Sequence, residues 1–119
     1  MRVLICDDER DIRLLYRSAF QQFGVDVVVA SDGDECVRAA EEDRPDMVVL
    51  DLMMPVRDGF STLTELHGRW PSTHVYIVSA YASPENFMRV RALGAEDCFD
   101  KLDFLGRIPA LIARCGTAA

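Results

Sequence analysis

Short apolar runs alternate with longer amphipathic stretches along the whole chain. The runs predict strands at 3–6, 25–30, 47–50 and 75–78, and a weaker strand at 97–100. The first, third and fourth runs are continuously apolar, which is typical of strands covered by helices on both faces of a sheet. This alternation predicts an α/β protein with a doubly wound, five-stranded parallel sheet and five flanking helices.

Helix boundaries are indicated by glycine, proline and capping residues between these strands. The predicted helices run from Asp11 to Gly24, from Gly33 to about Asp43, from after Pro55 to near Gly68, from Ser83 to Leu93, and through a last stretch ending near Cys115. Pro109 removes a backbone donor, so the last helix is expected either to start late, near Gly106, or to bend there.

Length and composition are those of one globular domain, predicted to span residues 1–119 with 116–119 as a frayed tail. The chain has 119 residues, of which 50% are hydrophobic and 28% charged, enough to bury one core. No apolar run approaches the roughly 20 residues that a membrane span needs, and no signal-peptide pattern follows Met1. Membrane insertion is therefore not expected.

The formal net charge of −7 argues against a nucleic-acid surface, because phosphates require a basic patch. Four widely spaced cysteines form no C-x-x-C pair: Cys6, Cys36, Cys98 and Cys115. A domain with a full core does not need disulfides, so reduced thiols in a cytoplasmic protein are expected.

Polar side chains stand where the predicted strands end. Asp7 and Asp8 follow the first strand, Asp51 the third, Ser79 the fourth and Lys101 the fifth. Ligands of open α/β sheets bind beyond the carboxyl ends of the strands. These five residues are therefore the candidate site.

Three carboxylates at one edge need positive charge nearby. Two of them about 5 Å apart repel by roughly 3 kcal/mol at an effective dielectric near 20. Lys101 supplies one charge, and a divalent cation is the obvious second. An all-oxygen ligand set suits Mg²⁺, and a bound cation together with Lys101 and Ser79 suits phosphoryl oxygens.

Five motifs in this order resemble the receiver domains of bacterial two-component response regulators. They are Asp7-Asp8, the segment Asp51-Leu-Met-Met-Pro-Val-Arg-Asp-Gly59, Ser79-Ala80, Gly94-Ala-Glu-Asp97, and Lys101. The resemblance covers essentially the whole chain and implies the flavodoxin-like strand order 2-1-3-4-5.

The resemblance also implies roles for the site residues. Asp51 would accept a phosphoryl group from a sensor histidine kinase or a histidine phosphotransfer protein, and Lys101 and Ser79 would bind that group. The implied Mg²⁺ ligands are Asp7, Asp8, Asp51 and the backbone carbonyl of Met53. Phosphorylation would move Ser79 and alter the face formed by the fourth helix, fifth strand and fifth helix, which would bind a downstream protein or output domain. No catalysis beyond slow autodephosphorylation is expected.

Two positions depart from the family's pattern. Leu102 follows Lys101 where the family usually has a proline with a cis bond, and because a cis bond before leucine costs about 3–4 kcal/mol, a trans bond is expected. Cys98 stands where the family usually has a tyrosine or phenylalanine that rotates on activation. Phe99 is offset by one residue, so it should face the other side of the sheet and pack in the core. Tyr81 is then the candidate relay.

Two other functions are compatible with parts of this pattern. One is a constitutive protein-binding module with a vestigial pocket, to which Cys98 and Leu102 lend weight. The other is a haloacid-dehalogenase-type phosphatase, which needs a second aspartate two residues after its nucleophile. Met53 occupies that position, and the chain shows no cap domain.

Overall fold

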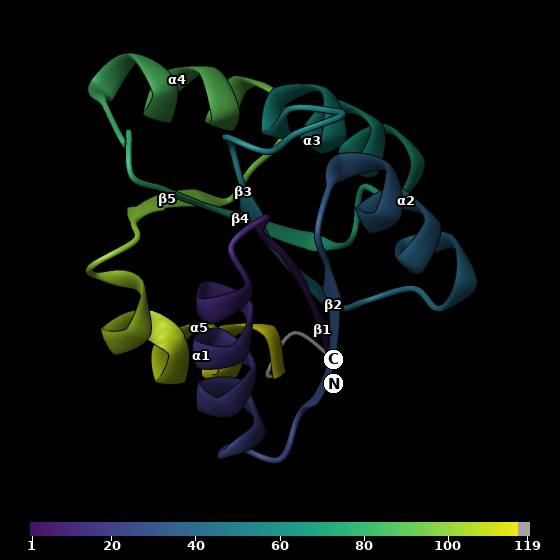
Figure 1. The fold of residues 1–119 in the computed structure, drawn as a ribbon, viewed down its shortest axis with the longest axis vertical. Helices are drawn as coiled ribbons and strands as arrows, with labels where there is room; N and C mark the ends of the chain where they lie inside the picture. The colour runs from purple at the N-terminus through teal and green to yellow at the C-terminus, as the bar shows by residue number, and fades with distance from the viewer. Residues whose placement is uncertain (117–119) are drawn as a thin grey trace.

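The computed structural model describes residues 1–116 as five parallel strands in the order β2-β1-β3-β4-β5, with helices on both faces (Figure 1). The elements are β1 (Arg2–Cys6), α1 (Arg10–Gln21), β2 (Asp26–Ala30), α2 (Gly33–Glu42), β3 (Met47–Asp51), α3 (Gly59–Arg69), β4 (His74–Ser79), α4 (Pro84–Ala92), β5 (Asp97–Asp100), a 3₁₀ turn (Phe104–Arg107) and α5 (Ile108–Gly116). The predicted fold class and strand order are confirmed.

The sheet divides the core into two layers (Figure 1). Alternate residues of each strand point to opposite faces. Thus Leu4, Val48 and Ile77 pack with α2, α3 and α4, whereas Ile5 and Val49 pack with α1 and α5. Every residue of β3 is buried. Burial on both faces explains why the central strands are apolar throughout.

Side-chain caps set the starts of three helices. Asp32 accepts a hydrogen bond from Glu35 N (2.8 Å), Asp58 from Ser61 N (2.9 Å) and Ser83 from Asn86 N (3.1 Å). The third helix therefore begins at Gly59 rather than directly after Pro55. Residues 52–58, between β3 and α3, form the loop that carries Met53.

The C-terminal helix starts late, at Ile108, after the 3₁₀ turn. Pro109 then lies in the first turn, where a backbone N–H has no intrahelical acceptor, so its missing donor costs nothing there. Gly116 is the last residue of α5, and the other residues of the predicted tail, 117–119, lie outside the described part of the chain. No peptide bond among residues 1–116 is cis, so Lys101–Leu102 is trans as expected.

The expectation of four reduced thiols is wrong for one pair. Cys6, the last residue of β1, forms a disulfide with Cys36 of α2. Both side chains lie in the same core layer, and their Cα atoms are 6.0 Å apart, within the usual range for a disulfide. Spacing along the sequence could not show this, because the contact arises when α2 packs across β1. Cys98 and Cys115 are free.

None of the helices within residues 1–116 has the length and apolar character required to cross a bilayer.

The disulfide predicts a dependence of stability on reductant. Closing a loop of 30 residues stabilises a fold by roughly 3–4 kcal/mol in the chain-entropy description, so reduction should lower the free energy of unfolding by about that amount in urea titrations. The Cys36→Ala variant should be insensitive to reductant. Thiol titration of the unfolded, unreduced protein should give two reactive thiols, and four would contradict the disulfide.

Candidate functional site

Strand register brings the predicted site residues to one edge of the sheet. Cys6 pairs with Leu50, so Asp7 and Asp51 come one position later on neighbouring strands. Asp51 in turn pairs with Val78, directly before Ser79. Ser79 pairs with Asp100, directly before Lys101. The residues predicted at the ends of four strands, Asp7, Asp51, Ser79 and Lys101, therefore lie at the same carboxyl edge of the sheet.

The carboxylates of Asp7 and Asp51 are buried and held by backbone donors. Asp7 and Asp51 are only 2% and 3% exposed. Asp7 Oδ1 accepts a hydrogen bond from Glu9 N (2.9 Å), and Asp51 Oδ1 accepts one from Met53 N (3.2 Å). Arg13 also donates to the backbone carbonyl of Asp7 (2.8 Å), which ties α1 to the end of β1.

Lys101 is the cation between these carboxylates. Its Nζ lies 3.0 Å from Asp51 Oδ2 and 3.2 Å from both Asp7 Oδ2 and Glu9 Oε1. Glu9 was not among the predicted site residues. The acidic run Asp7-Asp8-Glu9 was the only signal for it, and that run does not show which of its members reaches Lys101.

The charges of this cluster are not balanced. Burial and the charge of Asp7 raise the pKa of Asp51 to about 6, against the opposing effect of Lys101. Burial also raises the pKa of Asp7. Burial alone would lower the pKa of Lys101, but hydrogen bonding to Asp51 and the charges of Asp51 and Asp7 outweigh it, and the pKa is raised. The single ammonium group of Lys101 therefore does not neutralise the carboxylates, and further positive charge would stabilise their ionised forms.

The donor set fits a small divalent cation. Asp7, Asp8 and Asp51 each offer a carboxylate oxygen, and these atoms all lie within 4.8 Å of one another. Within residues 1–116 this is the only group of three or more His, Cys, Asp or Glu side chains arranged in that way. Asp8 is exposed, so the cluster opens to solvent on that side. Hard oxygen ligands of this kind suit Mg²⁺.

Ser79 and Met53 lie at the rim of the same cluster. Ser79 is fully buried, and its Oγ accepts a hydrogen bond from Tyr81 N (2.9 Å). Met53 is 60% exposed and Tyr81 is 65% exposed. The Ser79 hydroxyl is thus bonded to the backbone of the exposed loop after β4.

Cys98 and Phe99 lie on opposite faces of β5, as their one-residue offset predicts. Cys98 packs with the layer of α2, α3 and α4. Phe99 packs against the other layer, with its ring centroid 5.8 Å from that of Phe104.

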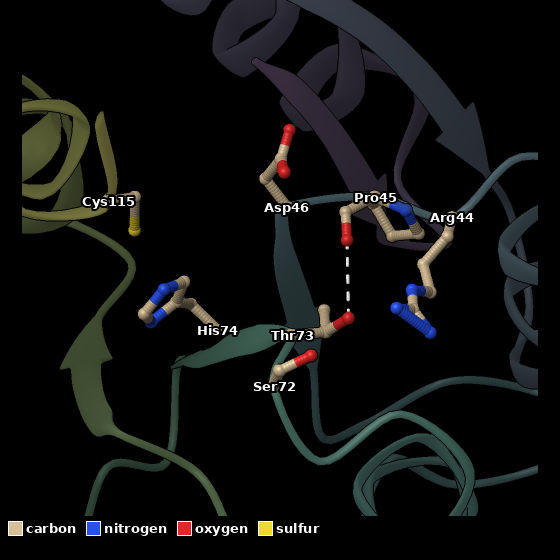
Figure 2. A pocket seen from close by; sticks show the side chains of 7 residues that line it. All are labelled: Arg44, Pro45, Asp46, Ser72, Thr73, His74 and Cys115. Atoms are coloured by element: carbon tan, nitrogen blue, oxygen red, sulfur yellow. Dashed lines mark hydrogen bonds between the residues drawn. The ribbon is translucent and has the colours of Figure 1, made fainter. Parts of the chain in front are cut away.

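A hollow of about 260 Å³ at the opposite, amino-terminal edge of the sheet is not part of this site. It is lined by Arg44, Pro45, Asp46, Ser72, Thr73, His74 and Cys115. His74 and Cys115 lie on one side of the start of β3 and Arg44 on the other (Figure 2). The His74 ring is bound to Glu96, and the Thr73 hydroxyl donates to Pro45 O. Two polar groups that line the hollow are therefore already paired.

A five-stranded parallel sheet with buried acids and a lysine at its carboxyl edge defines a doubly wound α/β protein with an acidic, lysine-bridged edge. Residues 3–112 match the family described as the response regulator receiver domain. The chain belongs to this family, the receiver domains of two-component response regulators, as the resemblance implied.

Curated relatives support this assignment. The chain is 35% identical, over 99% of its length, to the transcriptional regulatory protein PrrA of Mycobacterium tuberculosis. It is 34% identical, also over 99% of its length, to the alkaline phosphatase synthesis transcriptional regulatory protein PhoP of Bacillus subtilis. The matches cover 52% and 51% of these relatives, so the chain spans about half of their length.

A solved structure agrees with the fold. The receiver domain of the Francisella response regulator 1452 superposes with a TM-score of 0.83 at 32% identity, covering 95% of this chain and 97% of that one.

The acidic cluster predicts a stabilising effect of Mg²⁺. At tenfold excess over its dissociation constant, Mg²⁺ should stabilise the fold by about 1.4 kcal/mol, seen as a rise in melting temperature by circular dichroism. Asp8→Asn removes the exposed carboxylate of the cluster and should abolish most of this rise. Asp26→Asn removes an exposed acid outside the cluster and should keep it. Equal Mg²⁺ responses in the two variants would contradict a site at Asp8.

The tight approach of α3 to the end of β3 predicts a second effect. A Cβ at Gly59 would lie 2.5 Å from the backbone of Asp51 and Leu52, so Gly59→Ala should lower the free energy of unfolding by about 1–3 kcal/mol. At Gly68 of the same helix nothing lies within 4 Å of an added Cβ. Gly68→Ala should therefore be neutral or stabilise by up to about 1 kcal/mol. Urea titrations in which the two variants lose equal stability would refute this account.

Proposed function

We propose that Asp51 accepts a phosphoryl group from a sensor histidine kinase or a histidine phosphotransfer protein, with Mg²⁺, and that the domain then changes its partner-binding face. The arrangement of Lys101 carries this proposal. Its ammonium bridges the buried carboxylates of Asp51 and Asp7 at 3.0 and 3.2 Å. From there it can bind an oxygen of a phosphoryl group added to Asp51.

In this reaction a carboxylate oxygen of Asp51 attacks the phosphorus of a phosphohistidine. The new P–O bond forms as the P–N bond breaks, and the departing imidazole nitrogen takes up a proton from solvent. Backbone donation from Met53 N to Oδ1 holds the carboxylate in one orientation. Lys101 moves its hydrogen bond from Asp51 Oδ2 to a phosphoryl oxygen, which neutralises part of the added charge.

The residues proposed to hold Mg²⁺ are Asp7, Asp8, Asp51 and the backbone carbonyl of Met53. When bound, the ion supplies positive charge that shields the approach of one anion to another. The spacing of the three carboxylates and the raised pKa values of Asp51 and Asp7 support this assignment.

Ser79 connects the phosphoryl group to the surface in this proposal. Its hydroxyl would donate to a phosphoryl oxygen, and its approach would disturb the bond that it accepts from Tyr81 N. The loop after β4 is tied to α4, because Asn86 of α4 donates to Tyr81 O (2.8 Å). The change would therefore reach the face of α4, β5 and α5, which is proposed to bind a downstream protein or output domain.

Other properties follow from the same proposal. A cytoplasmic location suits a partner of histidine kinases, and the net charge of −7 speaks against direct binding of nucleic acid by this domain. Its only catalysis would be slow loss of its own phosphoryl group. A phosphatase of the haloacid-dehalogenase type would need a general acid at position 53, where the structure has an exposed methionine.

Phosphorylation tests this assignment directly. With Mg²⁺ and acetyl phosphate or a partner kinase, wild type should gain one phosphoryl group by intact-protein mass spectrometry, and Asp51→Asn should gain none. Asp26→Asn is the control and should be labelled like wild type. Labelling of Asp51→Asn at wild-type stoichiometry would refute Asp51 as the acceptor, and an unlabelled wild type would favour a constitutive binding module.

A further inference from the structure

The hydroxyl of Tyr16 is bonded to the main chain of Lys101, the lysine of the site. Tyr16 of α1 is 1% exposed, and its hydroxyl donates a hydrogen bond to the backbone carbonyl of Lys101 (3.3 Å). This contact joins residues 85 positions apart. Tyr16 touches the main chain of Lys101, whereas the ammonium of that residue lies among the carboxylates.

Three hydrogen bonds hold the main chain of the loop after β5, which leads into the fully buried Phe104. Lys101 N donates to Ser79 O (3.2 Å) and Asp103 N to Asp100 O (3.0 Å). Leu102 N donates to Asp100 Oδ1 (2.9 Å). Leu102 is 92% exposed, so its side chain contributes little to holding the loop. The bond from Tyr16 therefore acts together with these bonds on the position of the Lys101 backbone.

The Tyr16 ring itself is firmly placed. Its centroid lies 5.0 Å from that of Phe104, which in turn contacts Phe20 and Phe99. Burial, followed by the charge of Asp7, raises the pKa of Tyr16 to about 12. The hydroxyl accordingly stays protonated at neutral pH and remains a donor.

We propose that Tyr16 is a positioning residue for phosphoryl binding: it fixes the main chain of Lys101 so that the ammonium can reach a phosphoryl group on Asp51. This inference rests on the proposed function. Before transfer, Asp51, Asp7 and Glu9 all hold the ammonium. After transfer, the new negative charge lies on the phosphoryl oxygens, and the flexible lysine side chain reaches them only as far as its anchored backbone allows.

Tyr16→Phe tests the inference because it removes the hydroxyl and keeps the ring against Phe104. Beryllofluoride, with saturating Mg²⁺, is the phosphoryl probe. The net value of one hydrogen bond, about 0.5–1.5 kcal/mol, corresponds to a roughly 2- to 13-fold weaker beryllofluoride affinity. The affinity for Mg²⁺ alone should not change, because the Tyr16 hydroxyl donates to the Lys101 carbonyl and not to a carboxylate.

Tyr76→Phe is the matched control. Tyr76 is also fully buried, in the same core layer as Tyr16, and its hydroxyl donates to Glu96 (2.8 Å). Tyr76→Phe therefore removes one buried tyrosine hydroxyl and its hydrogen bond to Glu96, away from the site. Its beryllofluoride and Mg²⁺ affinities should both match wild type.

A double-mutant cycle separates positioning from a general loss of stability. In a Lys101→Ala background, Tyr16→Phe should have no further effect on beryllofluoride affinity, because the ammonium that it positions is gone. The inference would be overturned if Tyr16→Phe bound beryllofluoride with wild-type affinity, or if Tyr76→Phe lost as much beryllofluoride affinity. It would also be overturned if Tyr16→Phe lost Mg²⁺ affinity in parallel, or if its effect on beryllofluoride affinity were undiminished in the Lys101→Ala background. A wild type that binds no beryllofluoride and accepts no phosphoryl group would instead overturn the proposed function, and this inference with it.

Discussion

Burial of two carboxylates side by side is the constraint on which the rest of the structure depends. Asp7 and Asp51 stand one position beyond paired residues of β1 and β3, and both are almost inaccessible to solvent. Ionised groups so close together in a poorly hydrated place require a compensating cation. Lys101 provides part of that charge, and the residual negative charge is what makes the edge suitable for a divalent cation.

The loops at this edge are arranged around that requirement. The bond from Met53 N orients the Asp51 carboxylate. Because Gly59 has no side chain, the start of α3 can pack closely against the backbone of Asp51 and Leu52. The hydroxyls of Ser79 and Tyr16 bind backbone atoms of Tyr81 and Lys101. A change of charge at Asp51 therefore acts on segments that are already connected to it by hydrogen bonds.

Much of this arrangement could be predicted from local patterns. The bounds of β5 agree with prediction to the residue, and the acids and Lys101 were identified because parallel strands end at the same edge. Cys6 and Cys36 were wrongly predicted to be reduced thiols, since a 30-residue separation says nothing about which helix packs over which strand. Glu9 and Tyr16 were missed for a related reason: an acid next to other acids and an aromatic residue in an amphipathic helix look like surface and core residues.

The sequence by itself determined the alternation of strands and helices, the two-sided burial of the central strands, and the chemical types present at the strand ends. These are set by hydrophobic periodicity and by turn and capping residues, which act over a few positions of the chain. Only the tertiary structure decided that Glu9 shares Lys101 with Asp7 and Asp51, that Cys6 meets Cys36, and that Tyr16 reaches Lys101 across 85 positions. Those contacts depend on how helices pack onto the sheet and on side-chain direction, which no local pattern specifies.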